Sequence, residues 1–145
     1  PTLSSRCINF KISLSNKESI DIANKLLDNK LYEVINKDLI NYYFTPGNIY
    51  KLAQLSQKMG YDLSKISLEQ FLKVFLKDKN YKKNDSFKYL VFDLIESYFN
   101  DLTYSLRSDI FSQCEYFLKR ISQTRKFNLD EESLFIELEE QFFNG

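Results

Sequence analysis

The side chains that most often carry out catalysis or bind metals are scarce in this sequence. The chain of 145 residues has no histidine, which removes the usual general base and the commonest metal ligand. Its two cysteines, Cys7 and Cys114, lie far apart and lack the Cys-x-x-Cys spacing of a zinc or redox site. We interpret both as small packing residues, a use of cysteine that suits a reducing cytoplasm.

The charged side chains fit structural roles better than catalytic ones. Glu131 and Glu132 are adjacent carboxylates, but neighbouring residues of a helix point in different directions, so they are not interpreted as an acid–base pair. A lysine-rich stretch lacks arginines and an ordered interleaving of aromatic residues, which favours a solvated helix end and loop over a nucleic-acid patch. Its lysines are Lys73, Lys77, Lys79, Lys82, Lys83 and Lys88.

The composition favours a helical chain with no strong charge. Lysine plus arginine and aspartate plus glutamate number 20 each, so the whole chain is not expected to capture nucleic acid or an anionic membrane. There are 13 phenylalanines and 10 tyrosines but only 3 glycines and 2 prolines, which favours long helices with short connections. No apolar run approaches the roughly 18 residues that span a bilayer, and no signal peptide is present, so we expect a cytoplasmic protein.

The first dozen residues contain the only strand-like pattern in the sequence. Ile8, Phe10 and Ile12 alternate with polar residues, which predicts a half-buried strand. A lone strand cannot satisfy its backbone hydrogen bonds, and no second strand is visible to pair with it. We therefore expect this strand to belong to a sheet whose other strands are missing from the sequence.

Three helical segments are predicted between residues 15 and 62. Ser15 and Glu18 form a capping-box pattern that opens a helix over about residues 16–28. Residues 31–44 predict a second helix, either continuous or in two pieces around Asn36. Thr45 is placed to cap a third helix, which runs to about Met59 and stops at Gly60.

Four further helices are predicted after a linker at residues 61–65. Ser67 and Gln70 repeat the capping-box pattern at the start of a helix with a complete apolar stripe. A polar connection at residues 78–85 precedes the longest apolar stripe in the chain, and Ser108 is predicted to cap the helix after it.

The last helix is predicted over about residues 129–143, with Asn128 as its cap. Its apolar residues cover more of its circumference than one neighbouring helix can bury, so we expect it to contact more than one neighbour. These residues are Leu134, Phe135, Ile136, Leu138, Phe142 and Phe143.

The first seven residues, Pro-Thr-Leu-Ser-Ser-Arg-Cys, resemble the signature that precedes the last core strand in AAA+ clamp-loader subunits. Residues 127–137 also resemble the ending of bacterial clamp-loader collar domains, with Glu131 in place of the usual proline. The resemblance spans nearly the whole chain and implies a mainly α fold. It would comprise the end of an AAA+ core (residues 1–14), a three-helix lid-like domain (15–62) and a helical collar domain (66–145).

The resemblance implies roles for two side chains. The arginine of Ser-Arg-Cys is an arginine finger in this family, so Arg6 would act in trans on the ATP held by a neighbouring subunit. ATP-hydrolysing members resemble Gly-Ser-x-Arg at their sensor 2 motif, where the arginine contacts the nucleotide phosphates. Alignment on Gly47 places Tyr50 there, and a neutral phenol lacks the required charge. The chain would therefore help hydrolysis without performing it.

The resemblance also implies partners and a place in a larger machine. The partners would be the other subunits of the bacterial clamp loader, gamma or tau and delta, within the DNA polymerase III holoenzyme. The sliding clamp and DNA would be met only through the complex, and no cofactor, metal or membrane is expected for this part of the chain. The expected subunit interface consists of Leu134, Phe135, Leu138, Phe142 and Phe143.

Two other interpretations stay open. An ATP-hydrolysing gamma or tau subunit would have an intact phosphate-binding loop upstream of Pro1. An unrelated helical interaction module would bind its partner on the aromatic faces, and Ile8 to Ser13 would then be disordered or pack as a loop.

Overall fold

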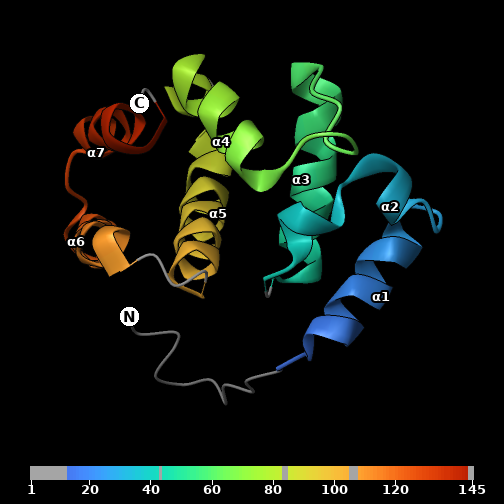
Figure 1. The fold of residues 1–145 in the computed structure, drawn as a ribbon. Coiled ribbons are helices and arrows are strands. Elements are labelled where there is room, and N and C mark those ends of the chain that lie inside the picture. The colour runs from blue at the N-terminus through green and yellow to red at the C-terminus, as the bar shows by residue number, and fades with distance from the viewer. Residues whose placement is uncertain (1–12, 43, 83–84, 105–107, 144–145) are drawn as a thin grey trace, which may run out of the picture.

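The computed structural model describes residues 13–42, 44–82, 85–104 and 108–143. Within these ranges the regular secondary structure is entirely helical, with seven α-helices and no strand (Figure 1). The prediction of a mainly α fold is therefore confirmed. The predicted strand at Ile8–Ile12 lies outside the described residues and stays a prediction.

The first helical group consists of α1 (Asn16–Leu26), α2 (Leu31–Val34), the 3₁₀ turn η2 (Lys37–Ile40) and α3 (Pro46–Met59). The capping box at the start of α1 is present as predicted, because the Ser15 hydroxyl accepts from the Glu18 N–H and the Glu18 carboxylate accepts from the Ser15 N–H. The Ser15 hydroxyl also donates to the Glu18 carboxylate, at 2.7 Å, and this hydrogen bond together with the one from the Ser15 N–H lowers the pKa of Glu18.

The second predicted helix is divided into α2 and η2, and Asn36 is the reason. Its backbone N–H donates to the Leu63 carbonyl at 2.8 Å, and its side-chain amide donates to the Ile66 carbonyl at 3.2 Å. Its side-chain oxygen accepts from the Asp38 N–H, which caps η2. The helix is interrupted at Asn36 because this residue forms hydrogen bonds with the segment that follows α3 and not with the preceding helical turn.

The limits of α3 agree with the prediction. The Thr45 hydroxyl accepts from the Asn48 N–H at 3.3 Å, and Pro46 occupies the first turn. Gly60 ends the helix in the left-handed conformation, with φ of 71°, which glycine adopts without steric cost.

The second helical group begins at Leu68, after the segment that Asn36 holds. Ser67 and Gln70 form the predicted capping box at its start. Its elements are α4 (Leu68–Lys77), the 3₁₀ turn η3 (Asn80–Lys82), α5 (Asp85–Tyr104), α6 (Ser108–Phe127), α7 (Glu131–Leu138) and the π-helical turn η4 (Glu139–Phe143).

The predicted cap of the last helix was wrong. Asn128 has a φ of 50°, and the following N–H, of Leu129, donates to the Thr124 carbonyl at 3.2 Å. This is the hydrogen bond of a left-handed helix C-terminus, so Asn128 ends α6. Asp130 caps α7 instead, because its carboxylate accepts from the N–H groups of Glu132 and Ser133.

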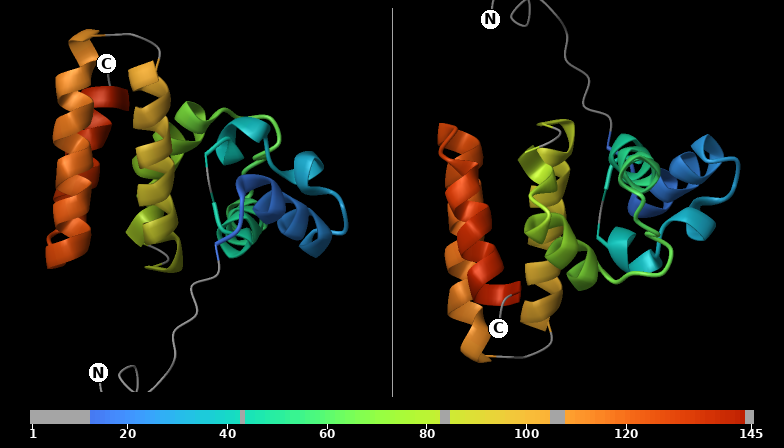
Figure 2. Two further views of the ribbon diagram at one scale, coloured as in Figure 1. Left: turned by 90° about the horizontal axis from the view of Figure 1, so that it is seen from below. Right: turned by 90° about the horizontal axis from the view of Figure 1, so that it is seen from above.

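The two groups share one continuous core. In the second group α5 and α6 lie side by side along their length, with α7 against α6 (Figure 2). In the first group α1 packs on α3, and α3 in turn meets α5 at a crossing. Buried apolar side chains run without interruption from Ala23 in α1 to Phe143 in η4.

Candidate functional site

The predicted catalytic residue, Arg6, lies outside the described residues, together with Cys7. Its role in trans therefore stays a prediction. The structure does describe the other predicted site residues, and it places them in two separate regions. Tyr50 lies on α3 in the first helical group, whereas the five predicted interface residues lie on α7 and η4 in the second.

Tyr50 lies on the outer side of α3 with 38% of its surface exposed. It borders a hollow of about 260 Å³ that is formed by the end of α1, the turn after it, the end of α2 and one face of α3. The charged residues among those that line this hollow are one acid, Asp28, and one base, Lys30. A site for nucleotide phosphates uses a concentration of positive charge and donors, and these lining residues do not supply one.

The five predicted interface residues lie together, but they face the interior of their own chain. Leu134, Phe135 and Leu138 are each only 1% exposed and Phe143 is 3% exposed, whereas Phe142 is partly buried. The predicted need for more than one neighbour is met within the molecule. An interface role for these side chains stays a prediction, but the described chain already covers them.

Aromatic contacts hold α7 and η4 against three other elements. The Phe135 ring lies 4.6 Å from that of Tyr81 in η3 and 5.2 Å from that of Phe92 in α5, measured between centroids. Phe142 is the counterpart in η4, with its ring 4.9 Å from Phe99 in α5 and 5.5 Å from Phe117 in α6. Such pairs add to the stabilisation that burial of their surface provides.

Charged contacts surround this aromatic core at its rim. Arg120 of α6 forms an ion pair with Glu137 of α7, and Tyr116 donates a hydrogen bond to the same carboxylate. Lys82 of η3 forms an ion pair with Glu132 in the first turn of α7. These pairs lie near the surface, so their contribution is to orient α7 more than to stabilise it.

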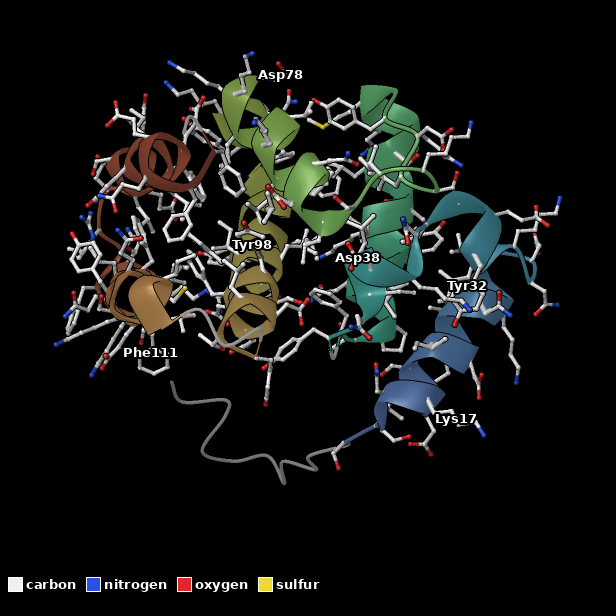
Figure 3. The ribbon with its side chains drawn as sticks, viewed as in Figure 1. Lys17, Tyr32, Asp38, Asp78, Tyr98 and Phe111 are labelled. Carbon is white, nitrogen blue, oxygen red and sulfur yellow. The ribbon has the colours of Figure 1, made fainter. Side chains whose placement is uncertain are left out.

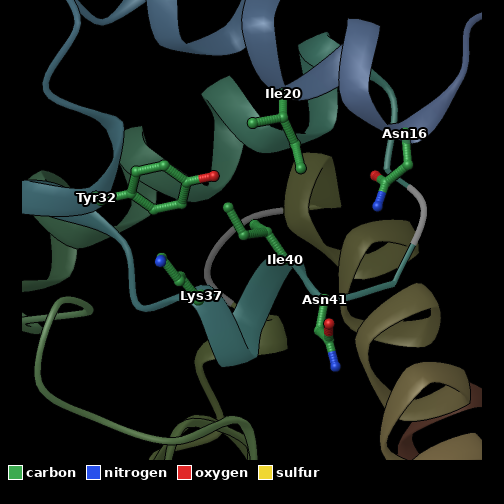
Figure 4. Close-up of a pocket in the computed structure, with 6 residues that line it drawn as sticks. All are labelled: Asn16, Ile20, Tyr32, Lys37, Ile40 and Asn41. Carbon is green, nitrogen blue, oxygen red and sulfur yellow. The ribbon is translucent and has the colours of Figure 1, made fainter.

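A second, smaller hollow lies between α1 and η2 in the first helical group (Figure 4). Its volume is about 160 Å³, below the roughly 300 Å³ at which small-molecule sites begin. Two of its lining residues contact each other, because the Lys37 ammonium lies 5.1 Å from the centre of the Tyr32 ring. We interpret this hollow as a packing feature of the helix pair. Its lining residues are Asn16, Ile20, Tyr32, Lys37, Ile40 and Asn41.

An exposed apolar region that was not predicted from the sequence lies on α6. Phe111 is 57% exposed and points away from the bundle (Figure 3). It borders a mainly apolar hollow of about 490 Å³ together with Thr103 of α5 and Leu118 of α6. The signal was present in the sequence, because Phe111 falls off the helical stripe that contains Cys114 and Phe117, both of which are buried as that stripe predicts.

The remaining chemistry of the described residues is modest. No three of their histidine, cysteine, aspartate or glutamate side chains come close enough together to hold a metal ion. Burial raises the pKa of the Cys114 thiol, which disfavours the reactive thiolate. No helix in the described ranges is both long and apolar enough to cross a lipid bilayer.

Comparisons of this chain with protein-family models, with curated proteins and with solved structures found no match in any of the three.

Proposed function

We propose that this chain is the C-terminal half of a non-hydrolysing structural subunit of the bacterial clamp loader, most like DNA polymerase III subunit delta prime. Such a subunit completes the ring that loads the sliding clamp on DNA, and Arg6 would serve the ATP site of its neighbour in trans. Partners would be the gamma or tau and delta subunits, in the cytoplasm.

The observation that carries the proposal is the order of features along the chain. A Ser-Arg-Cys segment comes first, followed by a helical group that ends at α3 and a second helical group that ends at η4. This is the order of core edge, lid and collar in the family that the sequence resembles. The helices and the Thr45-Pro46-Gly47 start of α3 are compatible with that order.

The assignment to a non-hydrolysing subunit depends on Tyr50. An arginine at this position would bring a permanent positive charge to the start of α3, and tyrosine brings none at neutral pH. Its exposed position on α3 is the position that a nucleotide-contacting residue of a lid helix would need. The alternative is an ATP-hydrolysing gamma or tau subunit, which an intact phosphate-binding loop upstream of Pro1 would reveal.

A helical interaction module is the alternative from another class. It is favoured by the exposed aromatic residues of α5 and α6, because Tyr104, Phe111 and Tyr116 are 86%, 57% and 45% exposed. Such a module would bind its partner through exposed aromatic residues of this kind and would have no link to ATP.

An assembly experiment separates these functions. The full-length protein would be mixed with the motor and delta subunits of the same organism and examined by gel filtration, with each subunit alone as the control. We expect a complex that contains the full-length protein in a fixed ratio. Elution of the full-length protein apart from the other subunits would contradict the proposal and favour the interaction module.

A further inference from the structure

Asp93 of α5 shares its carboxylate between two helices that do not belong to the same helical group. One oxygen, Oδ1, accepts a hydrogen bond from Arg125 of α6 at 2.6 Å. The other oxygen, Oδ2, accepts from the side-chain amide of Asn48 of α3 at 3.4 Å. A single side chain of α5 therefore connects the first turn of α3 with the last turns of α6.

Arg125 is held in place from several sides, so it presents its guanidinium to Asp93 in a defined orientation. A second nitrogen of the guanidinium lies 3.3 Å from the Glu96 carboxylate, and the group donates to the Tyr89 carbonyl at 3.3 Å. The guanidinium carbon lies 5.3 Å from the centre of the Phe92 ring. A planar guanidinium suits this combination of two carboxylates and a ring face, whereas an ammonium does not.

The contact between Asn48 and Asp93 lies where α3 crosses α5. Neither residue belongs to the segment between α3 and α4, which connects the two groups covalently. Another contact between the groups is formed beside that segment, where the Asp38 carboxylate accepts from the Leu68 N–H at 2.8 Å. The Lys58 ammonium also approaches the Phe87 ring, at 5.7 Å from its centre. The side chains of Asp93 and Arg125 are about one-third exposed, so water weakens their interaction without abolishing it.

From this geometry we infer that Asp93 and Arg125 form a clasp that sets the placement of α3, and with it the first helical group, against α5 and α6. Arg125 acts as a positioning residue through Asp93, since no hydrogen bond joins Arg125 to Asn48. When Arg125 is lost, Asp93 is free to turn away from α3, and the crossing loosens. This inference does not depend on the proposed function.

A double-mutant cycle between Asn48 and Arg125 tests the clasp in the intact protein. The readout is amide hydrogen exchange within α3, which reports local opening of that helix. Asn48→Ala and Arg125→Gln should each speed exchange in α3 by about twofold or more, the lower limit of coupling between residues that share a partner. The double variant should exchange no faster than the more affected single variant.

Arg120→Gln is the matched control. It removes another arginine–glutamate ion pair of α6, but that pair connects α6 with α7 and not with α3. It should leave exchange in α3 unchanged, and its effects should add to those of Asn48→Ala. If Arg125→Gln unfolds the chain, Arg125→Lys replaces it in the cycle and should again give less than additive effects with Asn48→Ala, with a smaller single effect and a smaller coupling. Unchanged exchange in α3, or additive effects of the Asn48 and Arg125 variants, would overturn the inference.

Discussion

At the scale of single residues, Tyr61 shows how one side chain holds the segment after α3 against the second helical group. Its hydroxyl donates to the Asp78 carboxylate at 2.8 Å and accepts from the buried Asn80 amide. Its ring meets Phe71 edge to face, with 6.4 Å between centroids. Burial, with the nearby Asp78 carboxylate adding to it, raises the pKa of Tyr61 to about 12.

Replacement of Tyr61 by phenylalanine should therefore remove a contribution to stability that depends on pH in the wild type. The ordinary pKa of tyrosine is 10.0, so the unfolded chain loses this proton before the folded chain does. The neutral phenol contributes its full stabilisation below pH 10, and that contribution declines as the pH rises from 10 through 12.

Chemical denaturation of both proteins between pH 7 and pH 12 measures this effect, because the other tyrosines and the lysines cancel in the difference. Wild type should be the more stable protein by a constant margin up to about pH 9 and by a shrinking margin above pH 10. A margin that stays constant to pH 12 would refute the assigned environment of Tyr61.

At the scale of elements, the sequence predicts helix starts well where their signals are local. The capping boxes at Ser15 and Ser67 lie within four residues, so their pattern can be read directly. The break at Asn36 was predicted only as an alternative, because its partners Leu63 and Ile66 lie about thirty residues away. No local pattern contains that information.

The start of α7 was misassigned for a different reason. Asn128 and Asp130 are equally suitable caps by residue type, and the sequence does not separate them. The hydrogen bond from Leu129 to Thr124 decides the matter, since it assigns Asn128 to the end of α6. The ambiguity arises because two helices meet within three residues.

Substitutions at these two positions test the assignment. Asn128→Gly should leave the free energy of unfolding unchanged or raise it by up to about 1 kcal/mol, because glycine adopts the left-handed conformation without a Cβ clash. Asp130→Ala should lower it by removing the cap of α7. Urea denaturation measures the free energy of unfolding of both variants. A loss of stability in Asn128→Gly with no loss in Asp130→Ala would indicate that Asn128 caps α7 after all.

At the scale of the whole molecule, α7 completes the core of the chain that carries it. The sequence predicted its broad apolar surface correctly, but it could not distinguish burial inside the chain from burial against another subunit. Composition and periodicity are the same in both cases. The structure shows that Phe135 is enclosed by η3 and α5, whereas Ile136 on the same helix is 38% exposed.

Phe135→Ala and Ile136→Ala form a matched pair that tests this arrangement. Phe135→Ala should lower the free energy of unfolding by about 3–5 kcal/mol, the usual result of emptying a buried phenylalanine site. Ile136→Ala should cost far less, because its side chain is already partly in water. Denaturant unfolding provides the comparison, and equal losses would show that Phe135 is not enclosed.

Charged substitutions on α7 and η4 separate folding from assembly in the proposed complex. A charge at Phe135 or Phe143 is expected to weaken assembly of the ring, but the burial of these rings means that it would do so by disrupting the chain itself. Because Ile136 is 38% exposed, Ile136→Asp is expected to keep the fold, which its denaturation curve checks, and gel filtration of this variant with the other subunits then reports on the outer face of α7. Intact assembly with a charge at Phe135 would contradict both its burial and its interface role.

Of the candidate site, the structure describes Tyr50 and the α7 residues. The role predicted for Arg6 depends on the resemblance of residues 1–7 to a family signature. Its expected partner is an ATP molecule on another subunit. No single-chain fold contains that partner. The role of Arg6 therefore has to be tested in the assembled complex.

The central measurement is ATP hydrolysis by a complete clamp loader that contains the full-length protein with Arg6→Ala. We expect assembly on gel filtration to be unchanged and hydrolysis at the neighbouring site to fall by about 10³-fold, the lower end of what arginine fingers contribute. Lys11→Ala, a charge removed from the same segment, is the control and should hydrolyse ATP normally. Unchanged hydrolysis by an assembled Arg6→Ala complex would contradict the arginine-finger role.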